Sequence, residues 1–446
     1  MSSPAATAAD QEGEEMPPTK TSRVEEEHQD EDQAPCDPWT YCCQSDSESC
    51  PSPSAAAAAA ANDSEDDPED LTEEGLKARN AVLAVSKSVV ALAASIVGAD
   101  GDPPSTLACT GTVVSHEDSA TWILTSATLI RKQGTDTEVH EASIAKIEVL
   151  LHNKKVVNGQ LLMYDLQYNV AVVSIDIQAD LPVVVLSDLP ESYFLTPSPV
   201  VAIARKFESQ SLQMKRGNTC RTVSDLDCNE LMISTCQIEQ VFIGGLLIDL
   251  EEKIVGMNFI DDETTPFLPV QVVRGCLTHF KKFREIKQPW LGIRGRALHV
   301  LELAKLEKIC HRCPKPHSGI LVDMIPEASR ANCEGVEVGD ILNQLDGVVL
   351  HSPGQLTAML LDKMVVAMDT RKPVVIKALV RRPRDGTTFD ADLKVMERPP
   401  GECDLLFKNR WTLPQPEMYY WVPAETVDWG DMSARSKRSC SKYLLS

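Results

Sequence analysis

The feature that most constrains this chain is a succession of short β-branched segments between residues 88 and 259, each closed by turn residues. Such segments, with few helical patterns among them, are typical of a barrel or a sandwich of β-strands. We therefore expect a mainly β fold here. Examples of the expected strands are Ser88–Val97, Leu107–Ser115, Thr121–Ser126, Ile144–Leu151, Asn169–Ile175, Pro199–Ala204, Leu231–Ser234, Leu246–Leu250 and Lys253–Phe259.

The negative charge of the chain is concentrated near its N-terminus. Residues 1–75 carry 21 Asp and Glu against two basic residues, whereas the remainder carries 45 acids and 41 bases. A body that binds nucleic acid needs a basic face, so we expect no nucleic-acid partner. Residues 1–78 cannot bury enough apolar surface to offset the entropy lost on ordering, which predicts a disordered acidic tail.

The sequence shows no membrane or export signal. No apolar run reaches the roughly 18 residues of a membrane-spanning helix, and the acidic N-terminus resembles neither a secretory signal nor a transit peptide. We therefore expect a cytoplasmic or nuclear protein without a membrane partner, in which the 14 cysteines are reduced thiols. The cluster Arg435–Arg438 is either a nuclear signal or solvated surface charge.

The pattern changes again near residue 287. A mixed module follows, with strand-like segments around a helix-like segment, Pro353–Met364. The sequence thus predicts a tail over residues 1–78, a β-rich domain over 79–286, an α+β domain over 287–398 and an extension over 399–446. The extension holds six aromatic residues between Phe407 and Trp429. Exposed together they would form an apolar patch, so we expect this segment to dock on one of the domains or on a partner subunit.

Three segments of the β-rich domain form a recognisable series. They read Leu-Thr-Ser-Ala-Thr-Leu-Ile over 124–130, Asn-Val-Ala-Val-Val over 169–173 and Val-Phe-Ile-Gly-Gly-Leu-Leu over 241–247. In this order they resemble the catalytic motifs of trypsin-like serine proteases of the Do-like (HtrA) type. The resemblance implies a chymotrypsin-like double β-barrel over residues 79–286. The alternative is another β-sandwich in which the matches arise by chance.

The residues that carry the chemistry of that family are replaced here. On this resemblance, Thr128 stands where the family has histidine, Asn169 where it has aspartate and Ile243 where it has serine. Val241 stands where the family has a glycine whose backbone N–H helps to bind the oxyanion. Peptide hydrolysis by this route needs a nucleophile, a base and oxyanion donors. We therefore expect no catalytic residues and an inactive protease homologue.

The alternative is a serine endopeptidase with a relocated active site. Side chains near the motifs could supply a displaced nucleophile or base. They are Ser126, Ser234, Thr235, Cys236, His116 and His140. Their other interpretation is as core, turn or surface residues.

The module over residues 287–398 resembles the PDZ domain that follows the protease domain in the same family. The resemblance rests on Pro289–Gly295, similar to a carboxylate-binding loop, and on Gly335–Leu342, with its Gly-x-x-x-Gly-Asp pattern. It implies that a peptide C-terminus or an extended peptide adds as a strand beside the sheet. The expected peptide-binding residues are Leu291, Gly292, Ile293, Leu356 and Met359. Other Do-like subunits are a further candidate partner.

We expect neither a cofactor nor a metal. Cys36, Cys42, Cys43 and Cys50 cluster in the tail without paired spacing. Cys310 and Cys313 form a single CxxC within the insert over residues 301–317, which also contains His311 and His317. One such pair is a weak zinc signal, and a mobile loop is the alternative interpretation of this insert.

The replaced catalytic residues and the PDZ resemblance together predict a peptide-binding scaffold as the function of this chain.

Overall fold

A computed structural model of the chain describes most of the two predicted domains. The described residues are 72–96, 105–117, 119–132, 138–140, 145–177, 180–222, 224, 226, 228–261, 264–313, 318–326, 333, 335–398, 411 and 419–421. The predictions for the acidic tail up to residue 71, for its cysteines, for His317 and for the basic cluster over 435–438 lie outside the described residues.

The first described element is a helix, α1 (Glu73–Val85). The Thr72 hydroxyl caps it by accepting a hydrogen bond from the Gly75 N–H at 3.0 Å, and two glutamates in its first turn favour the positive end of the helix dipole. Ala78, Ala81 and other small residues of α1 are buried. The expectation that the disordered tail extends to residue 78 is therefore wrong for residues 73–78.

Six strands close into a first barrel, in the order β1-β4-β5-β6-β3-β2, because β1 pairs with both β4 and β2. Leu92, Ile123, Val149 and Val173 fill its interior. The strands are β1 (Val89–Ile96), β2 (Ser105–Glu117), β3 (Ala120–Ser126), β4 (Ala145–Leu150), β5 (Val156–Asp165) and β6 (Val170–Asp176).

A second group of six strands closes in the order β10-β11-β12-β9-β8-β7, with β7 pairing both β8 and β10. The strands are β7 (Pro199–Arg205), β8 (Leu212–Cys220), β9 (Met232–Ser234), β10 (Leu246–Asp249), β11 (Ile254–Asn258) and β12 (Thr265–Pro269). The two barrels confirm the predicted mainly β, chymotrypsin-like double barrel.

A third sheet follows the barrels, in the order β13-β19-β18-β16-β15-β14, with β17 paired to β16. β14 is therefore an edge strand of this sheet. The strands are β13 (Pro289–Trp290), β14 (Arg294–Ala297), β15 (Ile320–Met324), β16 (Ile341–Leu345), β17 (Val348–Val349), β18 (Val374–Arg382) and β19 (Thr387–Glu397).

Three further helices accompany the strands: α2 (Val270–Phe283), α3 (Leu303–Arg312) and α4 (Pro353–Thr370). α3 lies within the insert for which a mobile loop was the alternative to a zinc site, and that loop interpretation is wrong over residues 303–312. The buried Ile309 gives this helix an apolar contact with the domain. None of the described helices combines the length and the apolar character that crossing a bilayer requires.

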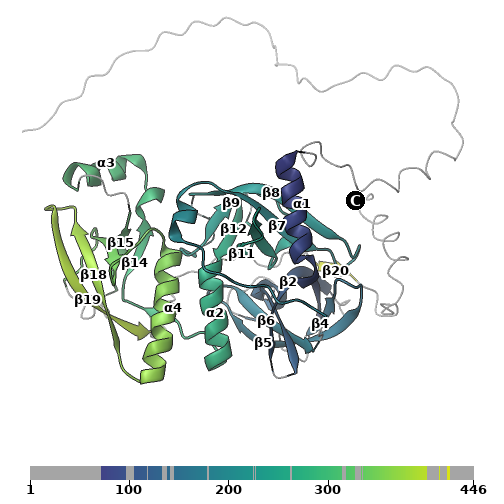
Figure 1. The fold of residues 1–446 in the computed structure, drawn as a ribbon. Helices are drawn as coiled ribbons and strands as arrows, with labels where there is room; N and C mark the ends of the chain where they lie inside the picture. The colour runs from purple at the N-terminus through teal and green to yellow at the C-terminus, as the bar shows by residue number, and fades with distance from the viewer. Residues whose placement is uncertain are drawn as a thin grey trace, which may run out of the picture. The chain divides into compact units, whose positions relative to one another are not determined.

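The helices α2 and α4 run side by side (Figure 1). Gly275 of α2 permits this close approach, because a Cβ at that position would lie 2.7 Å from Leu361 Cδ1 of α4. His279, fully buried on α2, donates through Nε2 to the Leu361 carbonyl at 2.9 Å. Its Nδ1 accepts from the Lys287 N–H at 3.1 Å. Both ring nitrogens are thus used by a neutral imidazole.

We predict that His279 makes the protein less stable below neutral pH. Burial lowers the pKa of His279 below its ordinary value of 6.5, so the unfolded chain takes up this proton at a higher pH than the folded chain does. The contribution of neutral His279 to the free energy of unfolding is complete above about pH 6.5. It declines as the pH falls, and at pH 5.5 it is smaller by up to about 1.4 kcal/mol.

Urea unfolding at pH 7.5 and 5.5 measures this effect. We expect the wild type to lose more stability between the two pH values than His279→Gln, whose amide can donate and accept but does not titrate here. An identical loss in the two proteins would show that His279 does not titrate on unfolding.

Two described parts of the aromatic extension contact the barrels. Trp411 is buried, its ring centroid lies 4.7 Å from that of Phe259, and its Nε1 donates to the Gln167 carbonyl at 3.3 Å. Strand β20 (Tyr419–Trp421) adds to the edge of β2. The predicted docking of the extension is confirmed for these residues, and its other aromatic residues lie outside the described set.

Candidate functional site

The structure brings Thr128 and Asn169 into direct contact. Thr128 lies in a 3-10 turn, η4 (Ala127–Ile130), that directly follows β3, and Asn169 directly precedes β6. β3 and β6 pair with Ser126 opposite Val170, so the two segments meet at one end of the first barrel. The Asn169 side-chain amide donates to Thr128 Oγ1 at 2.9 Å. Asn169 has a positive φ of 54°, a conformation that asparagine tolerates better than most residues.

Two further buried side chains form hydrogen bonds with the Thr128 hydroxyl and the Asn169 side-chain carbonyl oxygen. Ser126 Oγ donates to Thr128 Oγ1 at 3.0 Å, and Arg131 Nε donates to Asn169 Oδ1 at 3.1 Å. The Arg131 guanidinium is itself only 1% exposed, and its Nη2 donates to the Leu166 carbonyl at 2.7 Å. A hydroxyl, an amide and a guanidinium supply no general base near neutral pH.

Arg131 is a residue that sequence reasoning missed. Its signal was an arginine directly following an apolar run, Leu129-Ile130, within the segment that carries Thr128. A buried guanidinium needs acceptors on its N–H groups, and Asn169 and Leu166 supply two of them.

Ile243 is part of the apolar interior next to this polar group. It is 3% exposed and belongs to the same cluster as Ala127, Leu129 and Ala171. Its carbonyl accepts from the Thr110 N–H of β2 at 3.0 Å. The position therefore presents a hydrocarbon side chain, with no atom that could attack a carbonyl.

The backbone N–H groups of Ile243 and Gly244 are used internally. A 3-10 turn, η6 (Gln240–Phe242), precedes Ile243 and lets its N–H donate to the Gln240 carbonyl at 3.0 Å. The Gly244 N–H donates to the Asn258 carbonyl at 2.9 Å, and the Val241 carbonyl accepts from Thr110 Oγ1 at 2.7 Å. An oxyanion site instead needs N–H donors aimed at the substrate oxygen.

The candidate replacement nucleophiles are mostly buried and bonded elsewhere. Ser234 Oγ donates to the Thr265 carbonyl at 3.5 Å, and burial raises the pKa of the Cys236 thiol. Thr235 Oγ1 accepts from the Asn218 N–H at 2.9 Å.

The two candidate bases, His116 and His140, lie apart from the candidate nucleophiles. His116 contacts Thr121 Oγ1 and the Leu181 carbonyl through its two ring nitrogens, at 3.0 and 2.9 Å. Burial lowers the pKa of His140. Between described residues, no hydrogen bond joins either histidine to Ser126, Ser234, Thr235 or Cys236.

The predicted peptide-binding residues gather around the core of the third sheet. Leu291 and Ile293 are buried in that core, and Leu356 and Met359 of α4 pack against it half-buried. Gly292 has a positive φ of 78°, as a loop that turns sharply before β14 requires. The buried Cys333 contacts this loop, because its Sγ lies 3.6 Å from the Gly292 carbonyl oxygen.

The two thiols of the CxxC, Cys310 and Cys313, are free and half-buried. Among the described residues, no group of three or more His, Cys, Asp or Glu side chains is arranged to hold a metal ion.

The region of the two barrels is similar in sequence to known proteins. Residues 109–257 match the family model described as Trypsin-like peptidase domain. The Do-like 14 protein of Arabidopsis thaliana is 26% identical over 220 residues, which cover 47% of this chain and 51% of that protein. The family match begins within β2 and ends within β11, so it covers parts of both barrels. Residues 109–257 are therefore similar to a trypsin-like peptidase domain.

A human protein and a solved structure are similar to this chain at a comparable level. Serine protease HTRA4 of Homo sapiens is also 26% identical over 220 residues, covering 45% of this chain and 44% of that protein. The chain thus spans about half the length of the curated relatives that it matches. The solved structure described as HtrA-type protease AlgW with tripeptide is 20% identical in sequence to this chain. Its alignment covers 73% of this chain and 98% of the AlgW chain, with a TM-score of 0.48.

Proposed function

We propose that this chain is a proteolytically inactive HtrA-type homologue that acts as a peptide-binding scaffold. The observation that carries the proposal is the closed hydrogen-bonded group of Thr128, Asn169 and Arg131 beside the buried Ile243. Three positions that would have to supply a base, its partner and a nucleophile instead stabilise the barrel.

The proposal is supported by a second feature of the same region, the use of the Ile243 N–H within η6. Loss of one oxyanion donor typically costs about 10²–10³ in turnover. Loss of the nucleophile and base costs on the order of 10⁶. These deficits concern different groups that must act together when the peptide carbonyl is attacked, so a single substitution in this chain would not restore hydrolysis.

We propose that a peptide binds between β14 and α4, in a groove of a PDZ-type domain. β14 is the edge strand of its sheet, so its outer backbone groups can pair with an added strand. The N–H groups of the loop at Gly292 are suited to a terminal carboxylate. Leu356 and Met359 would contact the side chains of the peptide.

We predict that binding requires a free C-terminal carboxylate. The best binder from a library of C-terminal peptides should lose affinity about tenfold or more when its C-terminus is amidated, because charge-assisted hydrogen bonds are lost. Isothermal titration of the full chain with both forms measures the difference. Equal affinities would contradict the assignment of the loop.

A pair of matched variants on α4 locates the groove. Leu356→Ala should weaken binding of the same peptide, because Leu356 lines the proposed groove. Val366→Ala, at a position of the same helix that is 49% exposed, should leave the affinity unchanged. Equal losses in both variants would place the peptide elsewhere.

The runner-up function is serine-type endopeptidase activity from a non-standard site. Its support is the match to a peptidase domain and to relatives named as proteases. The buried state of Ser126, Ser234 and Cys236 favours the scaffold over this alternative.

A further inference from the structure

The helix α3 and the loop that joins β18 to β19 border an open cavity of about 450 Å³ at the surface of the domain. Four permanently charged side chains line it: Lys305, Lys308, Arg312 and Arg384. His311 completes the polar lining, while Ile309 and Pro383 contribute apolar surface. The cavity is therefore strongly basic, in a chain whose overall charge is −23.

The basic face of α3 follows from its sequence and from one buried contact. Lys305, Lys308 and Arg312 are spaced three and four residues apart, so they project from one face of the helix. Ile309 of the same face is only 7% exposed and packs with Leu298, Leu321 and Ile341 of the domain. This packing fixes the rotation of α3 and keeps the three cations at the cavity.

The opposite wall is held to the helix end. Arg312 Nη1 donates to the Arg384 carbonyl at 3.1 Å. The chain also approaches closely at Gly386, where a Cβ would lie 3.3 Å from the Arg312 carbonyl oxygen. A fixed distance between α3 and the loop gives the cavity a defined size.

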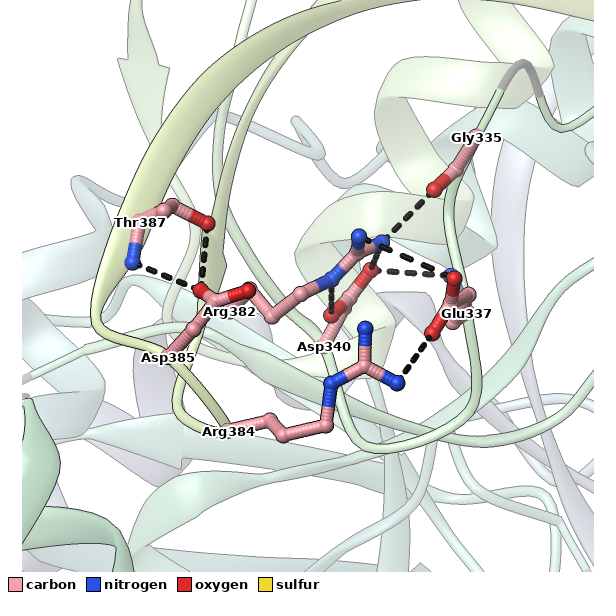
Figure 2. A network of polar contacts seen from close by, with 7 residues as sticks. All are labelled: Gly335, Glu337, Asp340, Arg382, Arg384, Asp385 and Thr387. Atoms are coloured by element: carbon pink, nitrogen blue, oxygen red, sulfur yellow. Dashed lines mark hydrogen bonds and ion pairs between the residues drawn. The ribbon is translucent and has the colours of Figure 1, made fainter.

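A polar network anchors the loop to the rest of the domain (Figure 2). Arg382 binds the Asp340 carboxylate through Nε and Nη2, at 2.8 and 2.7 Å, and its Nη2 also donates to the Gly335 carbonyl at 2.7 Å. Asp385 accepts from the N–H and the hydroxyl of Thr387, at 3.0 and 2.6 Å. Arg384 is therefore carried by a loop with little freedom to move.

The positive charges of the cavity are only partly neutralised. Glu337 contacts Arg384 at 3.2 Å, and Glu307 lies 3.9 Å from His311. Lys305 and Lys308 form no ion pair with any described residue, and no carboxylate lines the cavity. Like charges held this close repel one another, and a bound anion would relieve that repulsion.

We propose that this cavity binds a compact molecule that carries several phosphate groups. The volume suits a small molecule, and two guanidinium groups with two ammonium groups match clustered phosphate oxygens. The lining holds no Phe, Tyr or Trp side chain, and four of its seven residues are cationic, so its chemistry is directed at phosphate groups and we take a phosphorylated polyol as the ligand class. The same phosphate cluster could be free in solution or could form the headgroup of a lipid.

Isothermal titration of the full chain with inositol hexakisphosphate at about 150 mM salt tests the proposal, since salt at this level screens diffuse surface attraction. We expect one site per chain. The double variant Lys305→Glu/Lys308→Glu should weaken binding about tenfold or more, because two attractions become repulsions. The double variant Lys372→Glu/Lys394→Glu has the same net charge, alters exposed lysines of the same domain outside the cavity and should bind as the wild type does.

Three results would overturn the proposal: no binding by the wild type, equal losses in the two double variants, or citrate binding as tightly as the phosphate ester. Circular dichroism of each variant ensures that a loss of binding is not a loss of folding. If the variant at α3 unfolds, Arg384→Gln on the opposite wall should show the same selective loss. Sedimentation with vesicles that contain a phosphoinositide, with and without competing inositol hexakisphosphate, distinguishes the lipid source from the soluble source.

Discussion

Gly244→Ala is expected to destabilise the protein by roughly 2–5 kcal/mol, the sum of a left-handed backbone penalty and an overpacking penalty. Gly244 has a φ of 76°. A Cβ there would lie 2.6 Å from the Thr110 carbonyl oxygen and 2.7 Å from the Ser126 N–H nitrogen. These are backbone atoms of the first barrel, which cannot move aside as a flexible side chain could.

Gly347→Ala is the matched control. Gly347 also has a positive φ, of 80°, but a Cβ there would meet no atom within 4 Å. Its cost should be limited to the backbone penalty of about 1–2 kcal/mol. Urea midpoints of the two variants measure the difference. Equal losses of stability in the two variants would contradict the close contact of Gly244 with the backbone of Thr110 and Ser126.

Much of the double barrel could be predicted from periodicity, because its interior strands are continuous β-branched runs. The strand β6, with Val170, Val172 and Val173 all fully buried, is an example. The strand β5 was missed because its residues are mostly half-buried or exposed and carry little apolar signal. The same reason applies to β8, with its sequence Leu-Gln-Met-Lys-Arg-Gly-Asn-Thr-Cys.

The candidate site was predictable only in part. The motif order placed Thr128 and Asn169 in one site, and the structure joins them by a hydrogen bond. The role of Arg131 and the use of the Ile243 N–H within η6 depend on tertiary contacts. No local pattern encodes such contacts. The basic cavity was hidden for the same reason, since Arg384 lies more than 70 residues from α3 in the sequence.

The second large effect that we expect is the absence of peptide hydrolysis. Purified wild-type chain should degrade unfolded casein no faster than buffer alone, whereas enzymes accelerate such reactions by 10⁶-fold or more. Ile243→Ser should be equally inactive. The new hydroxyl would have Thr128 in place of a base, and its own N–H would still be bonded to Gln240.

The most direct test of the inactive-scaffold proposal is labelling with a serine-directed fluorophosphonate, alongside casein turnover and with trypsin as the positive control. Wild type and Ile243→Ser should both remain unlabelled, because the probe reacts with an activated serine. Turnover of casein by the wild type that the fluorophosphonate blocks would contradict the account and establish a serine endopeptidase.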